Sequence, residues 1–170
     1  IYVIGNDGTK VLIDTTPDLR QQCLREGITR VDAVVYTHAH ADHILGFDEL
    51  RRFNILSKRP MDVYGDSATL QSLRRTFSYA FDSGAPVGGG VPDVSLMMID
   101  GPFEVGKLRF QPLHLMHGTR PVLGFRIGRF AYLTDCNSVP DETMAQLGGL
   151  EVLVRDALRQ RPHPPHFSLK

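Results

Sequence analysis

The sequence has little cysteine, and it lacks any apolar run approaching the roughly 18 residues that a membrane span requires. Only Cys23 and Cys136 are present, far apart, which excludes a cysteine-rich secreted scaffold. A reducing compartment, the cytoplasm, is therefore the expected location, and we expect no membrane partner.

Net charge is absent as well. Nineteen basic and 19 acidic residues give a formal net charge of +0, so no global field attracts a nucleic-acid polymer, and none is expected as a partner. With 170 residues and 42% hydrophobic content, the chain is long enough for one domain with a sizeable core. We predict a single domain over residues 1–170.

Strand and helix patterns alternate along the chain. Residues 1–14 read as two strands joined at an Asp-Gly turn, and a helix follows with Thr16 as its N-cap and with Leu19 and Cys23 on one face. Hairpins mixed with strand-helix units predict an α/β protein with mixed sheets. The further expected elements are strands within 31–36, 61–65, 103–113, 124–135 and 150–154, helices over 67–81 and 139–147, and a loop over 82–93.

The stretch "VVYTHAHADHILGFDEL" carries the most chemistry. In an extended segment His38 and His40 share a face, with the small Ala39 turned aside. Asp42 and His43 follow at the bend into a helix-like pattern. Four ionisable groups in six positions behind a buried strand predict a metal site, and nitrogen and carboxylate donors suit zinc, manganese or iron.

Later polar residues add candidate ligands at strand ends. Asp135 ends the strand "FAYLTD", and its alternative role is that of a solvent-facing turn former. Of the histidines in "PLHLMHG", we choose His117, because Gly118 lets the backbone bend past a metal, and regard His114 as structural. The thiol of Cys136 is a rival ligand, which strand alternation turns away.

The proline-rich segment "RPHPPHFSL" holds His163 and His166 near the end of the chain. A surface loop with two incidental histidines and a functional loop are equally compatible with it.

"THAHADH" matches the HxHxDH signature of the metallo-β-lactamase superfamily, and "HG" and "TD" follow in the order which that family uses. The wider pattern resembles the branch that contains a phosphoribosyl cyclic-phosphate phosphodiesterase. The resemblance implies an αββα sandwich with mixed sheets and two divalent metal ions. It also implies the ligands: His38, His40 and His117 on one ion, Asp42 and His43 on the other, and Asp135 bridging them. The predicted catalytic residues are Asp42 and, as an acid near the leaving group, His166.

The implied activity is metal-dependent hydrolysis of a small cyclic or nucleotide-like phosphodiester by a metal-bridging hydroxide. The alternatives are a thioester or lactam hydrolase of the same superfamily and a metal-binding fragment without turnover. The resemblance also implies further elements before Ile1 and beyond Lys170, including one more metal-binding histidine. We therefore expect partial occupancy of the second metal position, or its completion by another chain in a homodimer.

Overall fold

The structure is a computed structural model that describes residues 1–82, 90–161 and 164–169. Its contacts divide the chain into two compact units. The first unit holds Ile1–Asp100 and Val105–Lys107, and the second holds Gly101–Glu104 and Leu108–Lys170. Each unit is described by itself below, and the single domain over residues 1–170 stays a prediction.

The first unit is built on a mixed five-stranded sheet with the order β1-β2-β3-β4-β5. β1 and β2 form the expected hairpin, and Gly8 takes the positive φ of 82° that its turn requires. β2, β3, β4 and β5 are parallel to one another. β5 was not predicted, because it is an edge strand with exposed Met97 and Met98 and no clear apolar alternation. The bounds are β1 (Tyr2–Ile4), β2 (Lys10–Ile13), β3 (Ala33–Val35), β4 (Met61–Gly65) and β5 (Val94–Met98).

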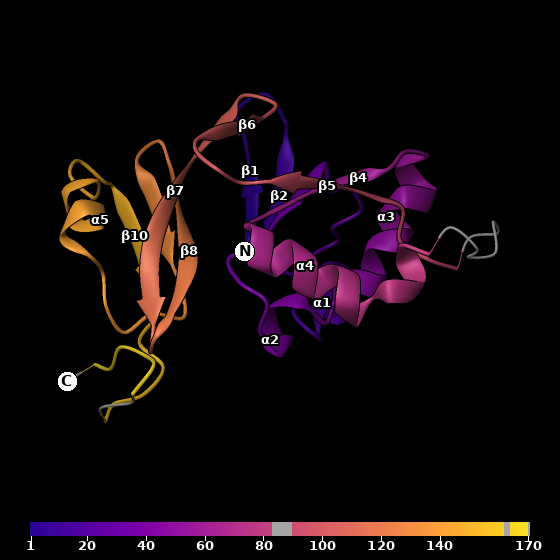
Figure 1. Cartoon of the computed structure of the whole chain (residues 1–170). Coiled ribbons are helices and arrows are strands. Elements are labelled where there is room, and N and C mark those ends of the chain that lie inside the picture. The colour runs from indigo at the N-terminus through magenta and orange to yellow at the C-terminus, as the bar shows by residue number, and fades with distance from the viewer. Residues whose placement is uncertain (83–89, 162–163, 170) are drawn as a thin grey trace. The chain divides into compact units, whose positions relative to one another are not determined.

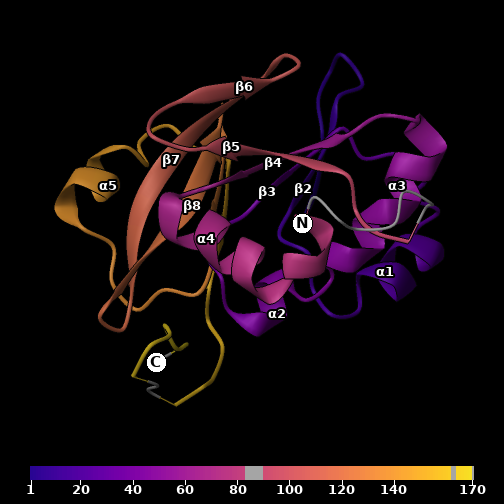
Figure 2. The same cartoon turned by 45° about the vertical axis from the view of Figure 1, so that its right-hand side comes forward.

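Helices cover one face of this sheet (Figures 1 and 2). Leu12, Val34 and Val63 of the strands pack with apolar side chains of the helices in one buried core. The helical segments are α1 (Leu19–Arg25), α2 (Ala41–Ile44), a 3-10 turn (Phe47–Glu49), α3 (Leu50–Ser57), α4 (Ser67–Thr76) and a second 3-10 turn (Ser78–Ala80).

Two details of these helices differ from the prediction. The N-cap of α1 is Asp18 rather than Thr16, because Thr16 accepts a hydrogen bond from the Leu19 amide in a separate turn ahead of the helix. The helix expected over 67–81 ends at Thr76, and the last turn is a 3-10 turn. Leu19 and Cys23 are both buried on one face of α1, as predicted.

The second unit contains the other mixed sheet, with the order β10-β9-β8-β7-β6. β7, β8 and β9 are antiparallel neighbours, and β10 pairs with β9 in parallel. The short helix α5 (Asp141–Ala145) packs on β7, where the Thr143 hydroxyl donates to the His114 carbonyl oxygen at 2.7 Å. The bounds are β6 (Phe103–Val105), β7 (Leu108–His117), β8 (Arg120–Ile127), β9 (Phe130–Leu133) and β10 (Val152–Arg155).

The predicted class, α/β with two mixed sheets, is confirmed. Most of the loop expected over 82–93 lies outside the described residues. Among the helices of the described residues, none is long and apolar enough to cross a membrane.

Candidate metal-binding clusters

The first cluster lies where β3 gives way to α2. His38 to His40 continue the chain in extended form, and α2 begins at Ala41. The rings of His38 and His40 lie 4.6 Å apart between centroids, and those of His38 and His43 lie 4.1 Å apart. Ala39 turns aside and packs against the core, as predicted. The strand-to-helix bend therefore gathers three imidazoles of the first unit.

Asp14 holds this cluster together through hydrogen bonds, and it was not among the site residues predicted from the sequence. It directly follows β2, is buried, and has a positive φ of 62°, which is rare for a side chain other than glycine. Its carboxylate accepts hydrogen bonds from the Thr37 amide, the Thr37 hydroxyl and His43 Nδ1, each at 2.8 Å. An aspartate at the end of a buried strand, followed by polar threonines, was the available signal.

These bonds also fix which ring nitrogens carry protons. The Thr37 hydroxyl gives its one proton to Asp14, so in its 3.0 Å contact with His38 Nδ1 the ring nitrogen is the donor. His43 Nδ1 likewise donates to the Asp14 carboxylate. When these rings are neutral, the free lone pair is therefore on Nε2. Metal-binding histidines commonly have this arrangement, in which one ring nitrogen donates to a protein oxygen and the other faces the metal.

His40 and Asp42 are less enclosed. His40 is half-buried, and the Asp42 side chain, in the first turn of α2, is 73% exposed. Asp42 Oδ2 lies 3.6 Å from His43 Nε2, so this carboxylate and this ring nitrogen face the same space. The pair is suitably placed to offer one oxygen and one nitrogen to a cation.

The second cluster begins at the end of β7, in the second unit. His117 is buried, and its Nδ1 donates to the Pro165 carbonyl oxygen at 2.7 Å, which again leaves the lone pair on Nε2. His114 is exposed, three residues earlier on the same strand, so the predicted alternation of these two histidines is confirmed.

Asp135, Asp156 and His166 also lie together in the second unit. One ligand atom from each is within 4.8 Å of the others. His166 Nδ1 donates to Asp156 Oδ2 at 2.6 Å, and Asp135 follows β9 with a positive φ of 48°. Positive φ at the two aspartates of these clusters is the kind of backbone strain that gathers at functional sites. Asp156 was missed in the sequence, because it follows an exposed strand and no motif includes it.

The segment around His166 is held by specific bonds. The Asn137 side chain accepts from the Gly118 amide and donates to the Pro164 carbonyl oxygen, each at 2.8 Å. The rings of His117 and His166 lie 4.7 Å apart. The hydrogen bonds of Asn137 argue against an incidental surface loop at His166. His163 lies outside the described residues.

Cys136 has the wrong properties for a metal-binding thiolate. It is fully buried, and burial, reinforced by the nearby Asp156 carboxylate, raises the pKa of its thiol to about 12. The neutral thiol therefore dominates at neutral pH. This agrees with the choice of Asp135 over Cys136.

The fold and the two clusters define an α/β protein whose nitrogen and oxygen donors suit divalent cations. A family model described as a beta-lactamase superfamily domain matches residues 9–170. The chain therefore belongs to the beta-lactamase superfamily.

Several known proteins are similar to this chain. An octanoyltransferase of Porphyromonas gingivalis is 37% identical over 171 residues, which cover 100% of this chain and 34% of that protein. A solved diphosphatase from the PhnP family is 41% identical with a TM-score of 0.87, over 97% of this chain and 62% of that one. Zinc-bound PqqB from Methylobacterium extorquens shares the fold, with a TM-score of 0.68 and 18% identity over 94% of this chain and 60% of that one. The chain thus spans about a third of the octanoyltransferase and under two thirds of the diphosphatase.

Proposed function

We propose that this chain forms the metal-binding part of a hydrolase that acts on a small cyclic or nucleotide-like phosphodiester. The proposal joins the two clusters: His38, His40 and His117 would hold one divalent ion, Asp42 and His43 would hold a second, and Asp135 would serve both. Zinc and manganese fit these donors best, and iron fits as well. Convergence of the two clusters on one centre is part of the proposal.

The observation that carries the proposal is the anchoring of three ring nitrogens. His38, His43 and His117 each donate through Nδ1 to a protein oxygen, and so each presents the Nε2 lone pair. Histidines that serve only packing need no common tautomer. The same arrangement at three rings, in a superfamily member, supports a metal-binding role.

Bound divalent ions would lower the pKa of water toward neutrality and neutralise charge on phosphoryl oxygens. The chain itself supplies the remaining groups. Asp156 holds His166 through Nδ1, so the proton of a charged His166 ring at Nε2 is directed away from Asp156 and is available to a leaving alkoxide. Asp156 is then a positioning residue, and His166 is the proposed acid.

A second candidate is hydrolysis of a diphosphate. It is favoured by the 41% identity to the diphosphatase, which extends over 97% of this chain. A phosphate leaving group needs less protonation than an alkoxide, so the two candidates make different demands on His166.

Metal content tests the ligand set directly. Elemental analysis of the metal-loaded chain should show one full equivalent and a partly occupied second one, and in an intact protein Asp42→Ala should lose the second equivalent together with nearly all turnover. His117→Ala should also lose metal. His114→Ala is the matched control, because this exposed histidine lies on the same strand and faces the other way. Unchanged metal content in Asp42→Ala and His117→Ala would refute the ligand assignment.

Substrate profiling of a full-length protein tests the reaction. We expect turnover of bis-p-nitrophenyl phosphate above that of a thioester and of nitrocefin. Higher activity on either of the latter would instead support a thioester or lactam hydrolase. Metal binding without turnover of any substrate would support a non-catalytic role.

His166→Ala tests the acid. In an intact protein, the loss of turnover should be about 10²- to 10⁴-fold on an alkyl phosphodiester and far smaller on a nitrophenyl ester, whose leaving group needs no proton. Asp156→Asn should reproduce this selectivity in weaker form. Equal losses on both substrates, or loss of metal, would make His166 a ligand or a packing residue.

A further inference from the structure

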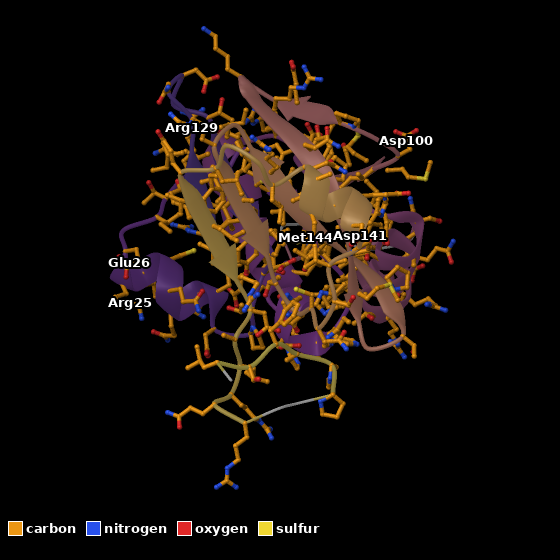
Figure 3. The ribbon with its side chains drawn as sticks, turned by 90° about the vertical axis from the view of Figure 1, so that its left-hand side faces the viewer. Arg25, Glu26, Asp100, Arg129, Asp141 and Met144 are labelled. Carbon is orange, nitrogen blue, oxygen red and sulfur yellow. The ribbon has the colours of Figure 1, made fainter. Side chains whose placement is uncertain are left out.

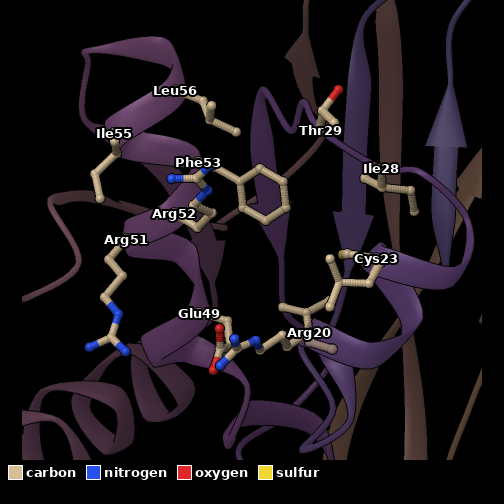
Figure 4. A pocket seen from close by; sticks show the side chains of 12 residues that line it. Arg20, Cys23, Ile28, Thr29, Glu49, Arg51, Arg52, Phe53, Ile55 and Leu56 are labelled. Carbon is tan, nitrogen blue, oxygen red and sulfur yellow. The ribbon is translucent and has the colours of Figure 1, made fainter.

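A cavity of about 470 Å³ lies between α1 and α3 in the first unit (Figure 4). Its floor consists of the buried side chains of Leu19, Cys23 and Phe53. None of the proposed metal ligands is among the residues that line it. The volume lies in the range of sites that bind small molecules.

The walls of this cavity are apolar and open to solvent. Leu24 of α1 is 68% exposed, and Leu56 of α3 is 49% exposed. Ile28, from the loop after α1, completes the wall opposite α3 (Figure 4). Exposed apolar side chains grouped around a concave floor are typical of a binding surface.

The charged side chains around the cavity are predominantly positive, although the whole chain has a formal net charge of +0. Arg20, Arg51 and Arg52 line it, with Glu49 as the single carboxylate among its lining residues. Arg51 is paired with Asp48 at 3.0 Å. Within the described part of the chain, neither Arg20 nor Arg52 forms an ion pair. Figure 4 labels both arginines, Arg20 on α1 and Arg52 on α3.

A second cavity of about 440 Å³ lies next to the first and shares the lining residues Thr29, Phe53 and Leu56 with it. Arg30 and Arg59 line this second cavity, and both pair with the single carboxylate of Asp32 at 2.9 Å. Together the two cavities carry five arginines against three carboxylates when Asp48 is included. An apolar floor under a rim with surplus guanidinium groups complements a ligand with an apolar body and an anionic head.

We propose that the α1–α3 cavity is a binding site for an amphipathic anion, namely a medium-chain aliphatic carboxylate. Its chain lies on Phe53, Cys23 and Leu56, and its carboxylate is bound by Arg52 and Arg20. A chain of about eight to ten carbons is smaller than a drug-sized ligand, for which sites of roughly 300–1,000 Å³ are usual, so it fits the cavity with solvent at the head. The site is separate from the proposed metal clusters and does not depend on hydrolysis.

Fluorescence of anilinonaphthalene sulfonate, itself an amphipathic anion, gives a direct assay with the complete chain. Decanoate should displace the dye, whereas a decyl ammonium ion with the same chain should displace it much less. Equal displacement by both ions would show that the site selects only apolar surface and would overturn the proposal.

Variants localise the site. Arg52→Gln should weaken decanoate binding about tenfold, the effect of one charge-assisted hydrogen bond. Leu56→Glu places a carboxylate against the ligand chain and should abolish binding. Met144→Glu is the matched control, because Met144 is 54% exposed, lies on α5 and does not line the cavity (Figure 3). Circular dichroism of each variant verifies that it is folded.

Sedimentation velocity tests the competing occupant, a second copy of this chain. Self-association that Leu56→Glu abolishes and decanoate does not affect would assign the surface to a protein interface and overturn the proposal. Decanoate binding that is unchanged in both Arg52→Gln and Leu56→Glu would also overturn it.

Discussion

Asp14 offers the sharpest test of how the first cluster is held together. Replacement by alanine removes the acceptor for the Thr37 amide, the Thr37 hydroxyl and His43 Nδ1, all of which are buried. It also places alanine at a φ of 62°, a conformation that aspartate tolerates better than alanine because its short polar side chain can hydrogen-bond locally.

The expected destabilisation follows from these contacts. Each buried donor left without an acceptor costs about 1–3 kcal/mol. The left-handed backbone adds less than about 1 kcal/mol, because Asp14 itself has a Cβ and alanine loses only the local hydrogen bonding that favours aspartate in this conformation. Since water will reach part of the space that is opened, we expect Asp14→Ala to lower the free energy of unfolding by about 3–6 kcal/mol. That is a large share of the roughly 5–15 kcal/mol typical of a domain.

Urea unfolding of the metal-free chain, followed by circular dichroism, measures this loss without a contribution from metal. Asp14→Asn is the informative comparison, because asparagine tolerates positive φ and keeps one acceptor for the Thr37 amide. It should cost less than alanine. Both variants should weaken metal binding by about 10- to 100-fold, since the His43 ring is no longer oriented by a carboxylate. A loss below about 1 kcal/mol for Asp14→Ala, with unchanged metal affinity, would refute the organising role of Asp14.

Two further changes test the packing and the electrostatics of the first unit. Gly46→Ala should lower the free energy of unfolding by about 1–3 kcal/mol in urea, because the new Cβ would overlap the Thr16 carbonyl oxygen. Gly101→Ala is the control, since a Cβ at this position meets nothing within 4 Å and should change stability little. Equal effects of the two substitutions would contradict the argument. Burial and the 2.6 Å hydrogen bond to Asp48 raise the pKa of Tyr79 to about 12 from 10.0, so the stability from this contact should be full below pH 10.0 and lost as pH rises through about 12. Ultraviolet titration of the wild type against Tyr79→Phe should locate this transition, and a Tyr79 that titrates at pH 10.0 would disprove it.

The local elements were largely predictable from the sequence. An Asp-Gly pair between apolar alternating residues predicts the β1–β2 hairpin, since only a few turn geometries join two strands so closely. The spacing of His38, His40 and His43 after an apolar strand predicts their grouping, because they are separated by only a few residues and one bend. The mistakes are the edge strand β5 and two helix ends. The 3-10 turn after α4 includes Tyr79, whose hydroxyl donates to Asp48, a residue distant in the sequence.

The partners of the cluster residues could not be predicted in the same way. Asp14 meets His43 across 29 positions, and Asp156 meets His166 across 10, in each case through a hydrogen bond that no short motif encodes. The cavity between α1 and α3 is similar, since its floor and rim come from separate helices that are adjacent only in the fold.

The sequence by itself determined the α/β class, the mixed strands and the histidine-rich bend, because each depends on local periodicity, turn geometry or close spacing. Only the tertiary structure decided which carboxylates hold the imidazoles and which nitrogen of each ring presents its lone pair. The reason is that a hydrogen bond depends on the position of both partners in space, and it is the parallel pairing of β2 with β3 that places Asp14 beside His43.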